Sequence, residues 1–308
     1  MARAFGKLIL FGEHAVVHGV AAIACGLERG LVAEVTPVGL DHSSLDLVGR
    51  RASEREDSPL GRAFTALLSA GVGRPRAAVH ATVQGELPPG MNLGFSAAAA
   101  VALARALAEA GTGDDAASVQ ARADAWERVF HGNPSGIDVA AALHGGVIRY
   151  RRGEPVVPLS MGASVRLCVG LSGTKPGPTS VMVESVAEQR RRDPASFERA
   201  LGSIADLVAR AEVALAAGRT ADLGQLMSIN HGLLAAWGLS TESLDELCVS
   251  ALTSGALGAK LTGAGGGGAM VALLGAGDSP EAVAVGRRTR EAWRVLGFDG
   301  FEVVVGAS

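Results

Sequence analysis

Two acidic residues in the middle of the chain have neighbours that suit the transfer of a phosphoryl group. Glu127 lies near the end of an expected helix at 115–130, and Asp138 follows a turn of Gly, Asn, Pro and Ser at 132–136. A phosphotransferase needs one carboxylate that holds Mg²⁺ and one that accepts the proton of the attacking hydroxyl. The spacing alone does not assign these two roles, and solvated surface carboxylates are the ordinary alternative.

A stretch at 87–100, LPPGMNLGFSAAAA, could hold a phosphate group because it places a turn directly before a strong helix-forming run. The unpaired amides and the dipole of a helix start favour an anion, and the hydroxyl of Ser96 could reach a metal ion on the phosphates. It is not a Walker A loop, since Gly90 and Gly94 are too close together and no lysine follows. An ordinary capped helix is the alternative.

A second stretch at 260–268, KLTGAGGGG, contains four consecutive glycines, which is more backbone freedom than a hairpin requires. Close approach of the backbone to a ligand would explain this excess, and a flexible turn fits the pattern equally well. Two loops that suit an anion raise the odds of a phosphate site.

The segment 5–19, FGKLILFGEHAVVHG, brackets a short apolar strand with glycines. It brings Lys7, Glu13 and His14 close together along the chain. Each charge alone would be an ordinary solvated or structural residue. Their clustering indicates a site.

The elements that must position these residues follow from apolar spacing. Strands are predicted at 7–11, 31–36, 78–83, 145–150, 165–171, 269–274 and 301–305. Helices are predicted at 96–110, 115–130, 178–192, 195–217, 219–236, 241–254 and 280–296. Prolines and glycines at 151–163 mark a domain boundary. We therefore expect an α+β fold with a sheet-rich domain at 1–160 and an α+β domain at 161–308.

Composition limits the kind of partner. The chain has 308 residues, 48% of them hydrophobic, which is enough for two cores, and its net charge of -3 predicts no nucleic-acid or membrane surface. Three cysteines, far apart in apolar runs, indicate buried thiols and a cytoplasmic, reducing compartment. We see neither a run of about 18 apolar residues nor a signal peptide, so we expect no membrane span.

Taken together, the four stretches resemble the GHMP small-molecule kinases. The match keeps the family's order and extends over nearly the whole chain, with a further match at 173–180, GTKPGPTS. GEHAVVHG and HGNPSGID are most similar to the members that act on mevalonate. The resemblance implies a two-domain GHMP kinase fold with the active site in the cleft between the domains. It also implies ATP and Mg²⁺ as cofactors and phosphorylation of (R)-mevalonate at its 5-hydroxyl, in the mevalonate route to isoprenoids.

Two alternatives stay open at this point. The first is another GHMP kinase, which acts on phosphomevalonate or a sugar. The second is a catalytically silent GHMP-like protein that binds a metabolite or a partner. A homodimer is also open, because the sequence does not determine the oligomeric state.

The resemblance implies roles for single residues. Asp138 would be the catalytic base and Lys7 its cationic neighbour, with Ser96 and Glu127 on Mg²⁺. The ATP phosphates would be bound by Pro89, Gly90, Met91, Asn92, Leu93, Gly94, Phe95, Ser96 and Ala97. Mevalonate would be bound by Glu13, His14, Ser135, Thr174, Gly263, Ala264 and Gly265, and residues 263–267 would close near the reacting phosphate.

Three positions depart from the family pattern. Phe5 stands where the family commonly has proline, and Met91 and Asn92 replace small residues of the phosphate loop. Asn tolerates left-handed backbone angles, so the loop could keep its shape. Phe95 replaces the first of two serines and adds bulk beside the nucleotide, which puts ATP affinity or base preference in question.

Overall fold

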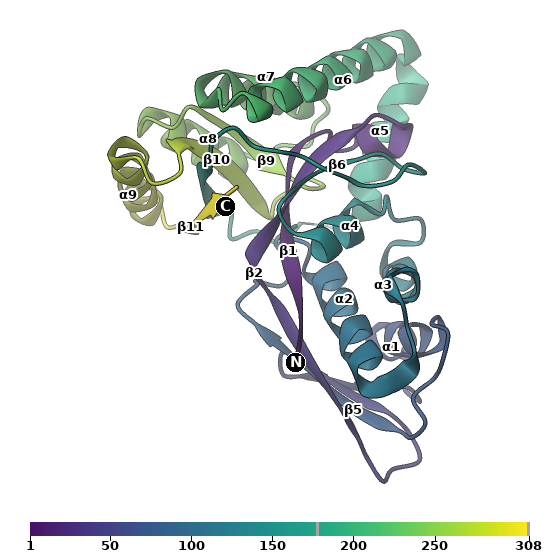
Figure 1. Ribbon diagram of the computed structural model, residues 1–308. Helices are drawn as coiled ribbons and strands as arrows, with labels where there is room; N and C mark the ends of the chain where they lie inside the picture. Colours follow the sequence, from purple (N-terminus) through teal and green to yellow (C-terminus); the bar gives the residue numbers. More distant parts are fainter. Residues whose placement is uncertain (177–178, 307–308) are drawn as a thin grey trace. The chain divides into compact units, whose positions relative to one another are not determined.

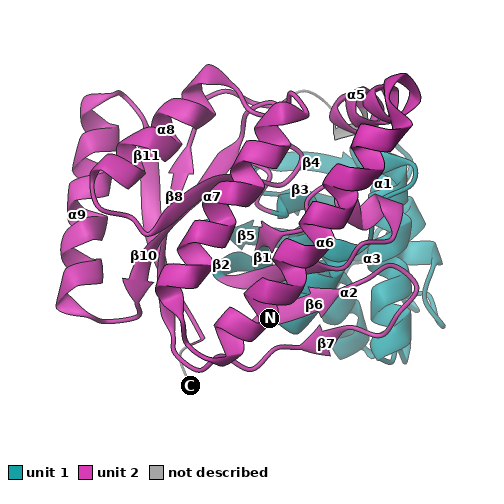
Figure 2. Cartoon of the chain, turned by 90° about the horizontal axis from the view of Figure 1, so that it is seen from above, with its two compact units in different colours: residues 1–7, 28–89, 94–145 teal, residues 8–27, 90–93, 146–308 magenta. Residues whose placement is uncertain are grey.

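The structure, a computed structural model, describes residues 1–176 and 179–306 (Figure 1). It divides into two compact units that interleave along the chain (Figure 2). Unit 1 comprises residues 1–7, 28–89 and 94–145, and unit 2 comprises residues 8–27, 90–93 and 146–308. The α+β class is confirmed. A domain division at residue 160 stays a prediction, whereas the compact units change over at Gly145 and Gly146.

The strands of unit 1 form around the second half of β2 (Ala22–Pro37), whose residues 31–37 pair antiparallel with β5 (Val79–Gly85). On its other side β5 pairs parallel with β3 (Ser44–Leu47), which forms a hairpin with β4 (Arg50–Ser53). The alternation in β5 buries Val79, Ala81 and Val83. The hairpin β3–β4 was not predicted, because its two four-residue strands are rich in polar and charged side chains.

The helices of unit 1 are α1 (Pro59–Ser69), α2 (Phe95–Leu107), α3 (Ala116–His131) and α4 (Ile137–His144). The alanine run 97–100 of α2 is fully buried, and its small side chains let α3 and α4 pack closely against this helix. Helix α2 begins after Gly94, in a left-handed conformation with φ of 75°, so Ser96 lies inside the first turn and is not its cap.

Unit 2 is built on an antiparallel sheet in the order β11–β8–β10–β9. The strands are β8 (Val165–Leu171), β9 (Gly258–Thr262), β10 (Ala269–Ala276) and β11 (Asp299–Val305). The helices α8 (Glu242–Thr253) and α9 (Pro280–Val295) pack on this sheet (Figure 1). They are joined where the indole Nε1 of Trp293 donates to the Leu247 carbonyl at 3.0 Å. Burial by helices explains why β10 is apolar along almost its whole length.

The remaining elements of unit 2 are the 3₁₀ turn η1 (Ala15–His18), short β6 (Val147–Tyr150) and β7 (Val157–Pro158), and the helices α5 (Thr179–Arg192), α6 (Pro194–Ala216) and α7 (Thr220–Ala236). The predicted helices and strands of this half are confirmed to within about two residues at most ends. Strand β9 was not predicted, because its residues 260–262 belong to the glycine-rich stretch 260–268, whose composition favours a loop.

The three cysteines lie in the interior, as the sequence predicted. Cys25, Cys168 and Cys248 are buried and free, and burial raises the pKa of the Cys168 thiol to about 12. No helix within the described part of the chain has both the length and the apolar character that a membrane crossing requires.

Candidate active site

The first site feature, in unit 1, is an ion pair between the middle of β1 (Ala2–Phe11) and the first turn of α4. The Nζ atom of Lys7 lies 2.7 Å from Oδ1 of Asp138. The lysine side chain is 4% exposed, whereas the aspartate side chain is 35% exposed. The cation is therefore enclosed by protein, while the carboxylate remains open to a ligand.

A buried hydroxyl and carboxylate lie in the same unit. Ser96 Oγ donates to Glu127 Oε1 at 2.5 Å, and the indole Nε1 of Trp126 donates to Ser96 Oγ at 3.0 Å. The α2–α3 packing places these side chains together. Burial raises the pKa of Glu127 to about 7; the hydrogen bond from Ser96 opposes this shift and the nearby Asp138 carboxylate adds to it.

This oxygen pair is compatible with magnesium. The described residues contain no group of three or more His, Cys, Asp and Glu side chains that could hold a metal ion by themselves. Mg²⁺ keeps several waters and is often bound by one or two carboxylates together with substrate phosphates. Glu127 and Ser96 offer hard oxygen atoms of this kind, and a carboxylate that burial leaves half protonated near pH 7 would gain from a cation.

The 89–94 loop enters α2 through unusual backbone angles. Asn92 has φ of 60° and Gly94 has φ of 75°, so Asn92 occupies the left-handed region that this residue type tolerates. A Cβ atom on Gly94 would lie 2.9 Å from Cβ of Lys7, so glycine lets the backbone that precedes α2 pass beside this lysine within unit 1. Phe95, the first residue of α2, is half-buried.

The glycine-rich loop (263–268) connects β9 to β10 in unit 2. It lies against Asn92, because a Cβ atom on Gly263 would meet the Asn92 side chain at 2.8 Å and one on Gly268 would meet its Nδ2 at 2.8 Å. Asn92 Nδ2 also donates to the Gly267 carbonyl at 3.4 Å. The excess of glycine thus permits close packing of this loop against Asn92. The approach of a ligand to the loop stays a prediction.

His14 is held in a strained conformation beside this loop, with φ of 58°. Its Nε2 atom lies 2.9 Å from the Ala264 carbonyl oxygen, and its buried Nδ1 atom has no partner among the described residues. A carbonyl can only accept, so Nε2 carries a proton. Burial lowers the pKa of His14, which favours a neutral ring with a lone pair on Nδ1.

Glu13 is buried with two further polar residues that the sequence reasoning did not select. Lys260 Nζ pairs with Glu13 Oε1, and Asn230 Nδ2 donates to Glu13 Oε2 at 3.2 Å. These three residues, which we call the buried cluster, are each no more than 1% exposed. Lys260 could have been selected from the sequence, because a lysine within an apolar strand is unusual. Asn230 could not, because a single asparagine in a helix is ordinary.

The other expected substrate residues lie in turns. Ser135 Oγ accepts from the Ile137 amide at 3.4 Å in unit 1. Thr174 in unit 2 is exposed, and its carbonyl accepts from the Gly268 amide at 3.0 Å. Part of the 173–180 motif, residues 177–178, lies outside the described residues.

The sequence-predicted residues thus fall into two groups. Unit 1 brings together Lys7, Ser96, Glu127 and Asp138. Unit 2 brings His14 to Ala264, and Asn92 and Thr174 to the glycine-rich loop. Within each unit, residues far apart in the sequence meet.

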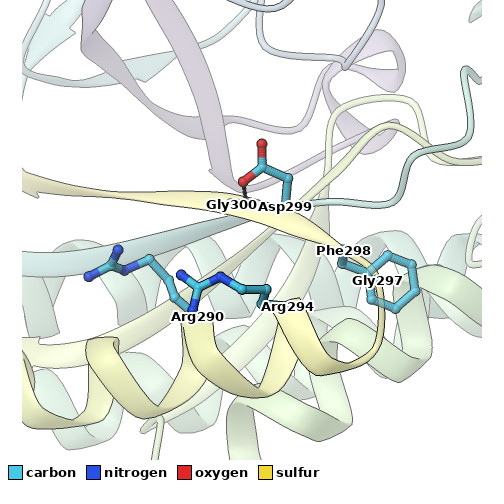
Figure 3. Close-up of a pocket in the computed structure, with 6 residues that line it drawn as sticks. All are labelled: Arg290, Arg294, Gly297, Phe298, Asp299 and Gly300. Carbon is cyan, nitrogen blue, oxygen red and sulfur yellow. Dashed lines mark hydrogen bonds between the residues drawn. The ribbon is translucent and has the colours of Figure 1, made fainter.

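A separate surface pocket of about 300 Å³ in unit 2 contains none of these residues (Figure 3). It is lined by Arg290, Arg294, Gly297, Phe298, Asp299 and Gly300. Its cations already have acidic partners, since Arg290 Nε donates to Glu302 Oε1 at 2.7 Å and Arg294 pairs with Glu291. This pocket is therefore not part of the candidate active site.

Family comparison covers both halves of the chain. Residues 60–146 match the model described as GHMP kinases N terminal domain, and residues 211–294 match that described as GHMP kinases C terminal. The mevalonate kinase of Aeropyrum pernix is 35% identical over 302 residues, covering 90% of this chain and 89% of that protein. The mevalonate kinase of Thermococcus gammatolerans is 34% identical over 313 residues and covers 92% of each.

Solved structures of GHMP kinases are also similar to this chain. The crystal structure of L. major mevalonate kinase in complex with R-mevalonate has a TM-score of 0.84 at 28% identity, covering 99% of this chain and 96% of that chain. Lactococcus lactis galactokinase complexed with galactose has a TM-score of 0.79 at 17% identity, covering 100% and 93%. At that lower identity the likeness shows a shared fold alone.

Proposed function

The chain belongs to the GHMP kinase family, and from this membership we propose that it transfers the γ-phosphoryl group of ATP to the 5-hydroxyl of (R)-mevalonate, releasing 5-phosphomevalonate and ADP. The names of relatives that are 35% and 34% identical support this substrate. So does the R-mevalonate in the L. major structure.

The observation that carries the chemistry is the Lys7–Asp138 pair, with its 2.7 Å contact. In the proposed reaction the substrate hydroxyl donates its proton to Asp138 as the oxygen attacks phosphorus. The Lys7 ammonium offsets negative charge on this carboxylate and on the moving phosphoryl group. Positioning and charge stabilisation would then supply most of the rate enhancement.

The nucleotide side of the proposal uses residues 89–97. Amides at the start of α2 and in the 89–94 loop would bind the ATP phosphates. Ser96 and Glu127 would hold Mg²⁺, which, when bound, would neutralise phosphate charge. The close Ser96–Glu127 contact supports this pairing.

The substrate side of the proposal uses His14, Ser135, Thr174 and residues 263–265, with Glu13 acting through His14. The Nδ1 atom of His14 has a lone pair suited to a substrate hydroxyl, because Nε2 is committed to Ala264. Phosphoryl transfer requires both loops and Asp138 at one phosphate, so we propose that they converge there. A crystal structure with an ATP analogue in which Asp138 lay more than about 15 Å from both loops would contradict this, since reacting atoms must approach to a few ångströms.

The proposed function is tested by a coupled assay of ADP release, in which mevalonate, phosphomevalonate and galactose are each supplied separately as the phosphoryl acceptor. We expect ATP turnover that depends on mevalonate. Turnover with only one of the other acceptors would assign another GHMP activity, and no turnover with any would favour a silent binding protein. We also propose a cytoplasmic location, which the free cysteines support, and a homodimer, which light scattering can test.

A further inference from the structure

The buried cluster ties three separate segments of unit 2 together at a single ammonium group. Lys260 Nζ donates to Glu13 Oε1, to the Leu261 carbonyl at 2.6 Å and to the Ile9 carbonyl at 3.4 Å. Three acceptors match the three protons of an ammonium ion. One side chain therefore joins the end of β1, the Glu13 turn and the strand that leads into the glycine-rich loop.

Both oxygens of Glu13 have partners within the protein. Lys260 binds Oε1, and Asn230 of α7 donates to Oε2. With the residue 1% exposed, this carboxylate has no face left for a substrate. These contacts hold the Glu13 side chain, and with it the backbone of the turn, in place.

That backbone carries His14. The Glu13 carbonyl accepts from the Ala15 amide at 2.6 Å, so the turn folds tightly around the strained His14. A non-glycine residue keeps a positive φ only where its surroundings over-determine it. Here the surroundings are the anchored Glu13 on one side and the Ala264 carbonyl on the imidazole.

The small number of lysines in the chain also indicates a specific role for Lys260. Among 28 Lys and Arg residues only three are lysine, at positions 7, 175 and 260. Lys7 and Lys260 are both buried. A guanidinium has five donors in a planar fork and would not fit a fully enclosed site that offers three acceptors. Lysine is therefore used where a compact ammonium is required.

We propose that Lys260, assisted by Asn230, is a positioning residue that acts through Glu13 to hold His14 and the start of the glycine-rich loop in place for the substrate. This inference rests on the proposed function for its kinetic consequence. Its structural consequence, a single fixed state of the His14 ring, can be measured without any substrate.

The ligand-free test is nitrogen NMR of the histidine rings, with His14 assigned by comparison with His14→Gln. We expect the wild type to show one neutral tautomer with its proton on Nε2, and Lys260→Met to show averaged nitrogen shifts. Asn230→Ala, which keeps the ion pair, should shift the signals less in the same direction. The control Asp114→Asn breaks the buried pair with Arg122 in unit 1 and should leave the His14 signals unchanged.

The kinetic test separates positioning from folding. In Lys260→Met we expect KM for mevalonate to rise at least about tenfold, while KM for ATP changes by less than about twofold. The double variant Lys260→Met/Glu13→Gln removes the charge left unpaired, so it should recover the melting temperature without recovering KM for mevalonate. Asp114→Asn should lower the melting temperature and leave both KM values unchanged.

The outcomes distinguish the positioning role of Lys260 from the proposed function. A wild-type KM for mevalonate with unaltered His14 signals in Lys260→Met would overturn the positioning role. So would a double variant that recovers both the melting temperature and KM. A wild type without mevalonate turnover whose His14 signals nevertheless depend on Lys260 would support the positioning of His14 and refute the proposed function.

Discussion

Lys7 Nζ lies 2.7 Å from Asp138 Oδ1, with the lysine nearly enclosed and about a third of the aspartate side chain exposed. In the same unit, the Arg122–Asp114 pair is instead enclosed at both ends, with neither side chain exposed. The asymmetry at Lys7 leaves the carboxylate to face a reactant.

Asp138→Asn should lower kcat by roughly 10² to 10⁴, because the amide is nearly isosteric but cannot accept a proton. Lys7→Met should also lower kcat, since it removes the charge beside the carboxylate and the phosphoryl group. Initial rates and circular dichroism would check both variants. Asp206→Asn, from an exposed pair with Arg210, is the matched control and should keep the wild-type rate. A folded Asp138→Asn that retains more than about a tenth of the rate would mean that Asp138 is not the base.

Glu127→Gln and Ser96→Ala should weaken Mg²⁺-dependent turnover while leaving the fold intact, because both remove an oxygen proposed for the metal. Turnover measured against Mg²⁺ concentration would show the effect as a raised half-saturation point. Wild-type activity of both variants at limiting Mg²⁺ would contradict the metal assignment.

The Mg²⁺ dependence should also vary with pH in a defined direction. Burial raises the pKa of Glu127 to about 7, so below that pH a proton competes with the cation for the carboxylate. Apparent Mg²⁺ affinity should therefore fall about tenfold per unit as pH drops below 7 and level off above it. Glu127→Gln should show no such slope, and calorimetry in two buffers of different ionisation enthalpy would detect the released proton. A flat wild-type profile would exclude this competition.

Phe95→Ser should strengthen ATP binding if the aromatic ring crowds the proposed phosphate loop. Calorimetry with ATP measures the change, and Phe95→Leu is the control that keeps an apolar side chain of smaller reach. Weaker ATP binding in the serine variant would instead identify Phe95 as a packing residue or a nucleotide contact.

Gly265→Ala should destabilise the protein by about 1–3 kcal/mol, because alanine is strained at positive φ. Gly265 has φ of 76°, and a Cβ atom there would meet the Leu239 carbonyl oxygen at 2.3 Å. Gly202→Ala in α6 is the matched control: no atom lies within 4 Å of the added Cβ, so it should stabilise by about 0.5–1 kcal/mol. Urea unfolding measures both, and a Gly265→Ala variant as stable as the wild type would show that the loop relaxes.

Much of the fold followed from the sequence because its long elements have clear periods. The strand 165–171 and the helices from α6 to α9 are apolar at regular spacing and end at Gly, Pro or capping residues. Helix α4 was missed, because eight residues after a Gly-rich turn carry too little periodic signal. Its omission mattered, since this helix aims Asp138.

Residue types and family resemblance suggested most of the candidate site, but not its internal supports. The contact between Lys7 and Asp138 depends on β1 and α4 folding together, and no spacing rule encodes it. Lys260 and Asn230 become notable only when their burial beside Glu13 is seen. Partnerships over such separations are set by tertiary packing, which a local pattern does not record.

The interleaving of the two units has a consequence for biosynthesis. The Ile9 amide donates to Thr262 Oγ1 across 253 positions of the chain. At a translation rate of about 5–20 residues per second, residue 9 waits roughly 13–50 s on the ribosome for this partner. Unit 2 can therefore be completed only near the end of synthesis. For the same reason, cutting the gene after Gly145 would not give two separately folding halves, because the second would lack residues 8–27.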